Sequence, residues 1–406
     1  LTGTKIFITY GEHTLTSNII HLVLARLPDA PPGTKGISLF VVPKYLVNDD
    51  GSLGRRNDVF CSKLEHKLGI HGSPTCVMNF GDEGGATGWI VGEPHRGLQY
   101  MFTMMNRARL GVGVQGVGVA EHAFQHALAY AKERRKGSAD GTPDGEMSPI
   151  ISHPDVRRML LSMKAKIAAA RALCCATAVA LDVAKFGADE ATRARADAEA
   201  ALLTPLAKSY GSDVGVEVAS EGVQIHGGMG FVEETGAAQF YRDARITPIY
   251  EGTNGIQCID LVGRKLTLNN GETLKEFLEG LHATILQLQT LENPLFGATA
   301  EALTQGIVHL AETTEWLIRK LFSDPRAALA GATPFGRLFS IVAGGTLLAR
   351  GALSATQAGD SSAEEAVLLA RHFAETQVPA AASLKFAVLR GADTIFGDTA
   401  DSLLRE

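Results

Sequence analysis

The sequence predicts an α+β fold that is mostly α-helical. Three observations support this fold class. Up to about residue 95, short β-rich segments alternate with turns, and from Gly97 onwards apolar residues recur with helical spacing. A polar break at Asn269–Gly271 then divides the helical part in two. At 406 residues the chain has room for two or three domains and a large core.

The first expected domain, residues 1–96, is a partial antiparallel β domain. Its strands are short and separated by turns, and the loop Pro28–Gly36 is too rich in Pro and Gly to continue a strand. This pattern is typical of an antiparallel sheet or open barrel. The expected strands are Lys5–Thr9, Ile19–Leu27, Ile37–Val42, Cys61–His66, Thr75–Phe80 and Trp89–Val91.

Residues 97–268 are expected to form a four-helix bundle, and residues 269–406 an additional C-terminal helical domain. A long apolar-periodic run, Gly97–Arg135, ends in a charge cluster and a polar loop. The next helix is expected to begin with a Ser152 or His153 cap, followed by Pro154 and an acidic residue in the first turn. Further helices are expected at Glu190–Ser220, Ala237–Arg242, Leu274–Leu291, Thr299–Phe322, Phe335–Ala358 and Ala363–Thr376.

Composition excludes some classes of function. The net charge of −6 gives no basic face for nucleic acid. Five cysteines without CxxC spacing fit a reduced, cytoplasmic compartment. The sequence contains no run of eighteen uncharged apolar residues, so no membrane span is expected, and no signal peptide is recognisable. The chain opens at Leu1, inside a predicted strand, so we expect that a piece of the protein precedes it.

One carboxylate, Glu251, lies between an apolar run, Ile246–Tyr250, and a turn of small residues, Gly252–Gly255. A carboxylate with few polar neighbours loses solvation, which raises its pKa and suits it to accept a proton near neutral pH. The glycines of Gly227–Gly230 allow a flat ligand to approach the backbone closely. We therefore interpret Glu251 as a candidate general base. The alternative, for a Glu-Gly turn taken alone, is a solvated surface loop.

Two other patterns do not predict function. Gly111–Gly116 matches the dinucleotide fingerprint GxGxxG, but helix precedes it where that fingerprint requires a strand. We expect these glycines to form a smooth face for close helix packing. Glu121, His122 and His126 have the spacing of metal ligands on a helix, but no further ligand is evident nearby. No metal site is therefore expected, and an exposed helix face is favoured.

The segment Tyr241–Gln257, YRDARITPIYEGTNGIQ, resembles the signature of the acyl-CoA dehydrogenase family, and Val223–Phe231, VQIHGGMGF, resembles its second signature. The long C-terminal extension is most similar to the larger bacterial branch, which includes 3-(methylthio)propanoyl-CoA dehydrogenases. The resemblance implies an N-terminal helical domain and the start of the β domain ahead of Leu1, which the fold expected for residues 1–406 does not include. The resemblance implies FAD-dependent α,β-dehydrogenation of an acyl-CoA thioester to the 2-enoyl-CoA. It also implies an electron-transfer flavoprotein as partner and a homodimer or homotetramer.

The resemblance also implies roles for individual residues. Glu251 is the base, and Arg109 lies near the thioester end of the substrate. The remaining residues contact FAD. Phe7 packs on the flavin ring and Thr9 donates to its N5 region, while Thr253 contacts the diphosphate. Contacts from the neighbouring subunit are implied for Arg134, Gln224, Gly227 and Gly228.

Two alternative functions stay open at this stage. An acyl-CoA oxidase would pass the electrons to oxygen. A flavin-binding relative of the alkylation-response branch would have weak dehydrogenase activity and bind DNA, and the acidic balance of the chain argues against it.

Overall fold

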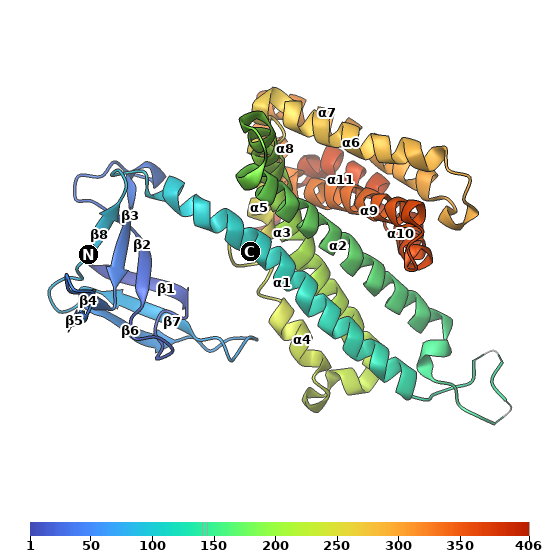
Figure 1. The fold of residues 1–406 in the computed structure, drawn as a ribbon, viewed down its shortest axis with the longest axis horizontal. Coiled ribbons are helices and arrows are strands. Elements are labelled where there is room, and N and C mark those ends of the chain that lie inside the picture. The colour runs from blue at the N-terminus through green and yellow to red at the C-terminus, as the bar shows by residue number, and fades with distance from the viewer. Residues whose placement is uncertain (140, 144, 406) are drawn as a thin grey trace. The chain divides into compact units, whose positions relative to one another are not determined.

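The computed structural model describes residues 1–139, 141–143 and 145–405 (Figure 1). The chain divides into two compact units, Leu1–Ala108 and Arg109–Glu406, and each is described by itself. The first unit contains small antiparallel sheets and the second is helical. This architecture confirms the predicted α+β, mostly α fold class. The three-domain division at residues 96 and 268 remains a prediction.

The first unit contains two three-stranded antiparallel sheets, ordered β1-β7-β6 and β2-β3-β8, and a β4-β5 hairpin. Its core is a buried apolar cluster that includes Phe40, Val42, Cys76 and Met78. The short strands β4 and β5 were not expected from the sequence. The strands are β1 Gly3–Thr9, β2 Ile20–Arg26, β3 Ile37–Pro43, β4 Tyr45–Val47, β5 Leu53–Arg56, β6 Val59–Leu64, β7 Thr75–Phe80 and β8 Trp89–Val91.

The second unit begins within a long helix and continues with the helices of the predicted bundle. The third helix extends to His226, further than expected, and Gly222, Ile225 and His226 of its last turns are buried. A π-helical segment, Leu261–Lys265, prolongs the last of these helices. The helices are α1 Gly97–Glu133, α2 Pro154–Phe186, α3 Glu190–His226, α4 Ala237–Ala244 and α5 Asn254–Asp260.

The C-terminal helices share a core with the bundle. α9 packs against α2, α3 and α5 as well as against α10 and α11, and α6 and α7 lie side by side (Figure 1). One continuous buried cluster, which includes Leu173, Leu206, Phe335 and Phe373, joins both parts. The helices are α6 Glu272–Gln289, α7 Thr299–Ser323, α8 Pro325–Ala330, α9 Ala332–Ala358, α10 Ala363–Thr376, α11 Ala380–Ile395 and α12 Asp398–Leu403.

The start of α2 differs from the prediction in one respect. Pro154 and Asp155 lie in the first turn as expected, but no side chain caps the helix. The ring of His153, at the cap position, instead forms a hydrogen bond through Nε2 with the carbonyl oxygen of Lys136, at 2.8 Å. His153 therefore occupies the expected cap position, but its ring ties the preceding loop to the helix start and does not cap the helix.

Glycines of α1 allow close packing against α3, as the sequence predicted. A Cβ atom on Gly113 would lie 2.5 Å from the carbonyl oxygen of Ala207, and one on Gly116 would lie 2.3 Å from that of Gly211. Further along, a Cβ atom on Gly222 would lie 3.5 Å from the carbonyl oxygen of Ala123. Residue numbers therefore rise together along the two helices. α1 and α3 run parallel, so their C-terminal ends meet.

Two helices, α2 and α9, are long and apolar enough to cross a membrane if judged only by length and composition. Helices in the core of a globular domain satisfy the same criterion. In α9 the most apolar window is 67% buried within the described chain.

The α1–α3 packing predicts the effect of single methyl groups. Gly116→Ala is expected to reduce the free energy of unfolding by about 1–3 kcal/mol, because the methyl group overlaps the α3 backbone. Gly118→Ala is the matched control, since a Cβ atom there meets no atom within 4 Å. It is expected to leave stability unchanged or to raise it by up to about 1 kcal/mol through helix propensity. Urea unfolding of both variants measures the difference, and equal effects would contradict the packing.

Candidate active site

Glu251 lies in a turn between α4 and α5 and is half-buried. Its φ angle is 55°, in the left-handed region, and that of Gly252 is 86°. The left-handed region costs a non-glycine residue roughly 1–2 kcal/mol. Residues in such strained conformations persist only where their surroundings hold them, and they cluster at functional sites. The strain at Glu251 therefore marks the turn as a candidate active site.

Two neighbouring side chains hold this turn. The amide Nε2 of Gln257, fully buried, donates to the carbonyl oxygens of Glu251 at 3.4 Å and Gly252 at 3.5 Å. The hydroxyl of Tyr250 donates to Oε1 of Gln115 on α1, which ties the turn to that helix. The backbone N–H of Asn254 donates to the carbonyl oxygen of Pro248 at 3.0 Å. The turn is thus fixed from both of its ends.

The structure brings Arg109 close to Glu251. Arg109 is only 7% exposed, and a Cβ atom on Gly252 would lie 3.9 Å from its Nη2. Burial lowers the pKa of Arg109, and the negative charges of Asp260 and Glu251 oppose that shift. The predicted base and the predicted substrate-binding arginine therefore occupy one polar site.

Thr253 begins α5. Its hydroxyl Oγ1 accepts a hydrogen bond from the backbone N–H of Ile256 at 3.3 Å, and the residue is exposed. Such an N-cap satisfies a helix donor that has no partner within the helix. Whether Thr253 also contacts a diphosphate remains a prediction.

A second site lies where the C-terminal ends of α1 and α3 meet. Arg134, Gly227 and Gly228, predicted separately from the sequence, all line one cavity of about 570 Å³. Gln224 is exposed on the last turn of α3, outside the lining of this cavity. The other lining residues are Tyr130, Lys136, Ile150, His153, Val156, Ile225, His226 and Met229.

The backbone and charges of this cavity suit an anionic ligand. Cβ atoms on Gly227 and Gly228 would meet nothing within 4 Å, so their backbone is open. Arg134 and Lys136 supply positive charge, and arginine matches phosphate oxygens through paired donors.

A buried histidine, missed in the sequence, forms one wall of the cavity. His226 is 4% exposed, and its Nδ1 forms a hydrogen bond with the carbonyl oxygen of Gly222 at 2.7 Å. Its ring stacks on Tyr130 and on His126, with centroid distances of 4.4 and 4.8 Å. Within the described part of the chain, Nε2 of His226 is buried without a hydrogen-bond partner. The position of His226 directly before Gly227 and Gly228 was the signal in the sequence that could have indicated its role.

Three residues with the spacing of metal ligands, Glu121, His122 and His126, make other contacts in the structure. Glu121 accepts from Nη2 of Arg171 at 2.5 Å, and the ring of His122 packs on Phe240 at 4.7 Å. His126 lies in the histidine stack just described. Among residues 1–139, 141–143 and 145–405, no group of three or more His, Cys, Asp or Glu side chains is placed to hold a metal ion.

Phe7 and Thr9 lie in the first unit, on β1. Phe7 has a φ angle of 59° and is 69% exposed. The pairing of β1 with β7 shifts register between Lys5 and Ile8, so Phe7 lies at an irregularity of the strand. An exposed aromatic ring at a bulge is available to a ligand, because bulges re-aim side chains. The contacts of Phe7 and Thr9 with flavin remain predictions.

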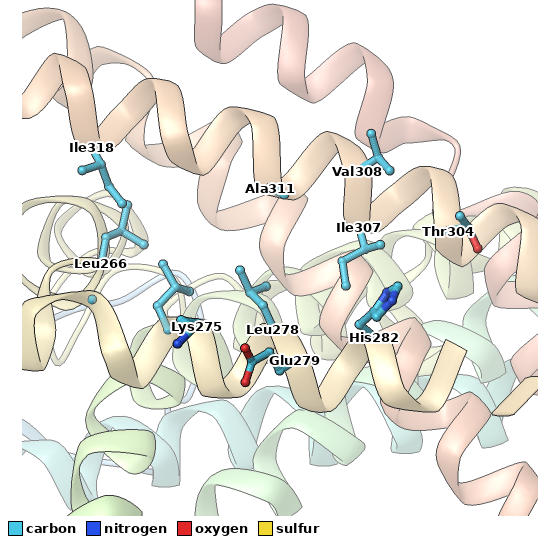
Figure 2. A pocket seen from close by; sticks show the side chains of 12 residues that line it. Leu266, Lys275, Leu278, Glu279, His282, Thr304, Ile307, Val308, Ala311 and Ile318 are labelled. Carbon is cyan, nitrogen blue, oxygen red and sulfur yellow. The ribbon is translucent and has the colours of Figure 1, made fainter. Parts of the chain in front are cut away.

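A separate apolar groove of about 530 Å³ lies between α6 and α7 (Figure 2). Leu278, Ile307 and Ile318 point into it, and the charged side chains Lys275 and Glu279 lie at its α6 side. None of the residues predicted to act on substrate or cofactor lines this groove.

Comparison with known proteins gives the family. Residues 95–266 match the family model for the acyl-CoA dehydrogenase C-terminal domain, and residues 272–397 match a model described as acetyl-CoA dehydrogenase C-terminal like. The chain is 47% identical over its full length to the 3-methylmercaptopropionyl-CoA dehydrogenase of Ruegeria pomeroyi, 67% of which it covers. The chain belongs to the acyl-CoA dehydrogenase family, as its two signatures predicted.

More distant matches agree with this assignment. A butyryl-CoA dehydrogenase of Syntrophomonas wolfei is 39% identical over 97% of this chain. An acyl-CoA dehydrogenase of Bacillus anthracis, solved in complex with FAD, has a TM-score of 0.75 at 22% identity over 99% of this chain and 65% of its own, and so shares the fold. The chain spans 67% and 64% of the lengths of the two curated relatives.

The two cavity glycines differ in backbone conformation, which predicts different tolerance to alanine. Gly227 has a φ angle of 60°, whereas Gly228 is not in the left-handed region. Gly227→Ala is expected to lower the free energy of unfolding by about 1–2 kcal/mol through backbone strain. Gly228→Ala, with the same open surroundings, is the control and is expected to unfold like the unchanged protein. Thermal unfolding without added cofactor distinguishes the two, and equal stability would contradict the backbone assignment.

Proposed function

We propose that the protein catalyses the α,β-dehydrogenation of an acyl-CoA thioester to the 2-enoyl-CoA, with FAD as the electron acceptor. The observation that carries this proposal is Glu251, strained and half-buried beside the buried Arg109. Its place in a chain of this family assigns the chemistry. The reaction removes two hydrogens from adjacent carbons, one as a proton from the α-carbon and one as a hydride from the β-carbon.

Glu251 accepts the α-proton at a carboxylate oxygen. Its backbone is fixed through Gln257 and Asn254, so the carboxylate is oriented before the substrate arrives. Arg109 contributes a fixed positive charge next to the carboxylate and the thioester end of the substrate. FAD, when bound, supplies the two-electron acceptance that no side chain provides.

The residues of the 570 Å³ cavity fit part of this cofactor. Arg134 binds a phosphate through paired donors, and the open backbones of Gly227 and Gly228 lie against it. By family resemblance this site serves the neighbouring subunit, together with Gln224, and a homodimer or homotetramer follows. Phe7, Thr9 and Thr253 complete the proposed cofactor contacts.

The proposed substrate is 3-(methylthio)propanoyl-CoA. The support is the 47% identity to a 3-methylmercaptopropionyl-CoA dehydrogenase. Short unbranched acyl-CoA thioesters are the substrates to compare with it, because a butyryl-CoA dehydrogenase is 39% identical to this chain. One methylene changes substrate binding by only about 1–3 kcal/mol. An electron-transfer flavoprotein reoxidises the cofactor, and the protein works in the cytoplasm.

Removing the base tests the proposed chemistry. In the full-length protein, Glu251→Gln is expected to lower kcat by about 10²–10⁴-fold, the usual contribution of a general base. The flavin absorbance spectrum and Tm are expected to stay unchanged. Glu234→Gln, at an exposed carboxylate outside the lining of the cofactor cavity, serves as the control and is expected to keep full activity. Assays with oxygen and with an artificial acceptor separate dehydrogenase from oxidase. Wild-type-like turnover of Glu251→Gln removes Glu251 from the mechanism.

The cofactor cavity is tested by a pair of adjacent arginines. Arg134→Met is expected to weaken FAD binding roughly 10- to 100-fold, because hydrogen bonds to charged groups contribute about 1.5–3 kcal/mol. Arg135→Met removes the same charge, but Arg135 is outside the cavity lining and donates to the carbonyl oxygen of Met147 at 2.9 Å. FAD titration of the stripped protein, followed by flavin fluorescence, compares them. Equal losses of affinity would show that net charge, and not the cavity, decides binding.

A further inference from the structure

A lysine that the proposed mechanism does not use is buried directly beside the Glu251 turn. Lys208 lies in the middle of α3 and is 0% exposed. It is the one charged residue between Glu199 and Asp213 in the sequence. Its Nζ donates to Oδ1 of Asn254 at 2.8 Å. Burying an ammonium group is unfavourable unless charges and hydrogen bonds compensate it.

Asn254 connects this lysine to the turn. It follows Glu251 by three residues and is the first residue of α5. Its Nδ2 donates to Asp213 Oδ1 at 2.7 Å, to Ser212 Oγ at 2.9 Å and to the carbonyl oxygen of Ser209 at 3.1 Å. All three acceptors are on α3, so the side chain of Asn254 fixes the turn to that helix.

Lys208 supplies the shorter of the two hydrogen bonds to Oδ1 of Asn254. The hydroxyl of Ser212 lies 3.1 Å from the same oxygen, but its single proton has a nearer acceptor, the carbonyl oxygen of Lys208 at 2.7 Å. A neutral amide could donate the same hydrogen bond as Lys208 without the cost of a buried charge. The hydrogen bond alone therefore does not account for an ammonium group at this position.

Charged groups of the active site act on Lys208. Burial lowers the pKa of Lys208 to about 8, and the positive charge of Arg109 acts in the same direction, whereas Asp213, Glu251 and Cys258 oppose the shift. These groups belong to α1, α3, α5 and the turn. Burial also raises the pKa of the Asp213 carboxyl and raises that of the Cys258 thiol to about 12.

We propose that Lys208 is a positioning residue for Glu251. Through Asn254 it holds the left-handed turn against α3, and its positive charge contributes to the electrostatic field at the carboxylate that accepts the substrate proton. The inference rests on the proposed role of Glu251 as the base.

Lys208→Met tests this in the full-length, FAD-loaded protein. We expect kcat to fall at least tenfold with little change in KM. On the alkaline side, turnover of the unchanged protein is expected to fall as Lys208 loses its charge near pH 8, and this step is expected to be absent from the pH profile of Lys208→Met. Hydrogen exchange of the peptide covering residues 250–257 is expected to become faster, while Tm stays within a few degrees of the unchanged protein.

Lys166→Met is the matched control. Lys166, on α2, is also largely buried, and its Nζ pairs with Glu217 at 3.3 Å and Glu221 at 3.6 Å, away from the turn. Its loss is expected to lower Tm but to leave kcat, the pH profile and exchange in residues 250–257 unchanged. The proposal is overturned if Lys208→Met keeps the kcat and pH profile of the unchanged protein, or if its loss of activity only follows a loss of Tm as in Lys166→Met.

Lys208→Gln separates hydrogen bond from charge and replaces Lys208→Met if that variant does not fold. The uncharged amide is expected to restore slow exchange in residues 250–257 but not the pH profile, and recovery of both overturns the role of the charge. If the unchanged protein does not reduce FAD with any acyl-CoA, or if Glu251→Gln turns over normally, the proposed function fails. Hydrogen exchange of residues 250–257, compared between Lys208→Met and the unchanged protein, then still decides whether Lys208 holds the turn.

Discussion

The side chain of Asn254 lies between α5 and α3 and hydrogen-bonds to four residues of α3 through both of its polar atoms. Because Lys208, Ser209 and Ser212 are buried, water competes little for these bonds, and they fix the start of α5 against α3. Glu251 precedes Asn254 by only three residues, so the same hydrogen bonds restrict the movement of its turn. A strained φ angle is tolerated there because the surrounding hydrogen bonds fix the backbone on both sides.

A second constraint is the close approach of α1 to α3. Gly113 and Gly116 permit backbone contact with α3, and the parallel register brings the two C-terminal ends together. That register explains why Arg134, just after α1, and Gly227, just after α3, line one cavity although they are far apart in sequence. Small residues in the middle of a helix therefore determine which residues meet at its end.

The sequence predicted the helical part well because its apolar period is long and its breaks are rich in Gly, Asn or Pro. Family resemblance alone predicted that Arg109 lies near Glu251 and that Arg134 and Gly227 both contact FAD, since no local pattern relates residues so distant. Lys208 and His226 were missed because their roles depend on burial, which one sequence does not display. A lone lysine within an apolar helix segment was the available signal. His153 lies at the expected cap position of α2, but its ring does not cap the helix because it bonds to a tertiary partner, the Lys136 carbonyl.

The central claim is that the Glu251 carboxylate meets the α-carbon of an acyl-CoA. A crystal structure of the full-length protein with FAD and a non-reactive acyl-CoA analogue tests it most directly. The account predicts a carboxylate oxygen of Glu251 within about 3–3.5 Å of the α-carbon, the usual separation of reacting atoms, with its φ angle still left-handed. A carboxylate turned into bulk water, or another base at the α-carbon, would contradict the account.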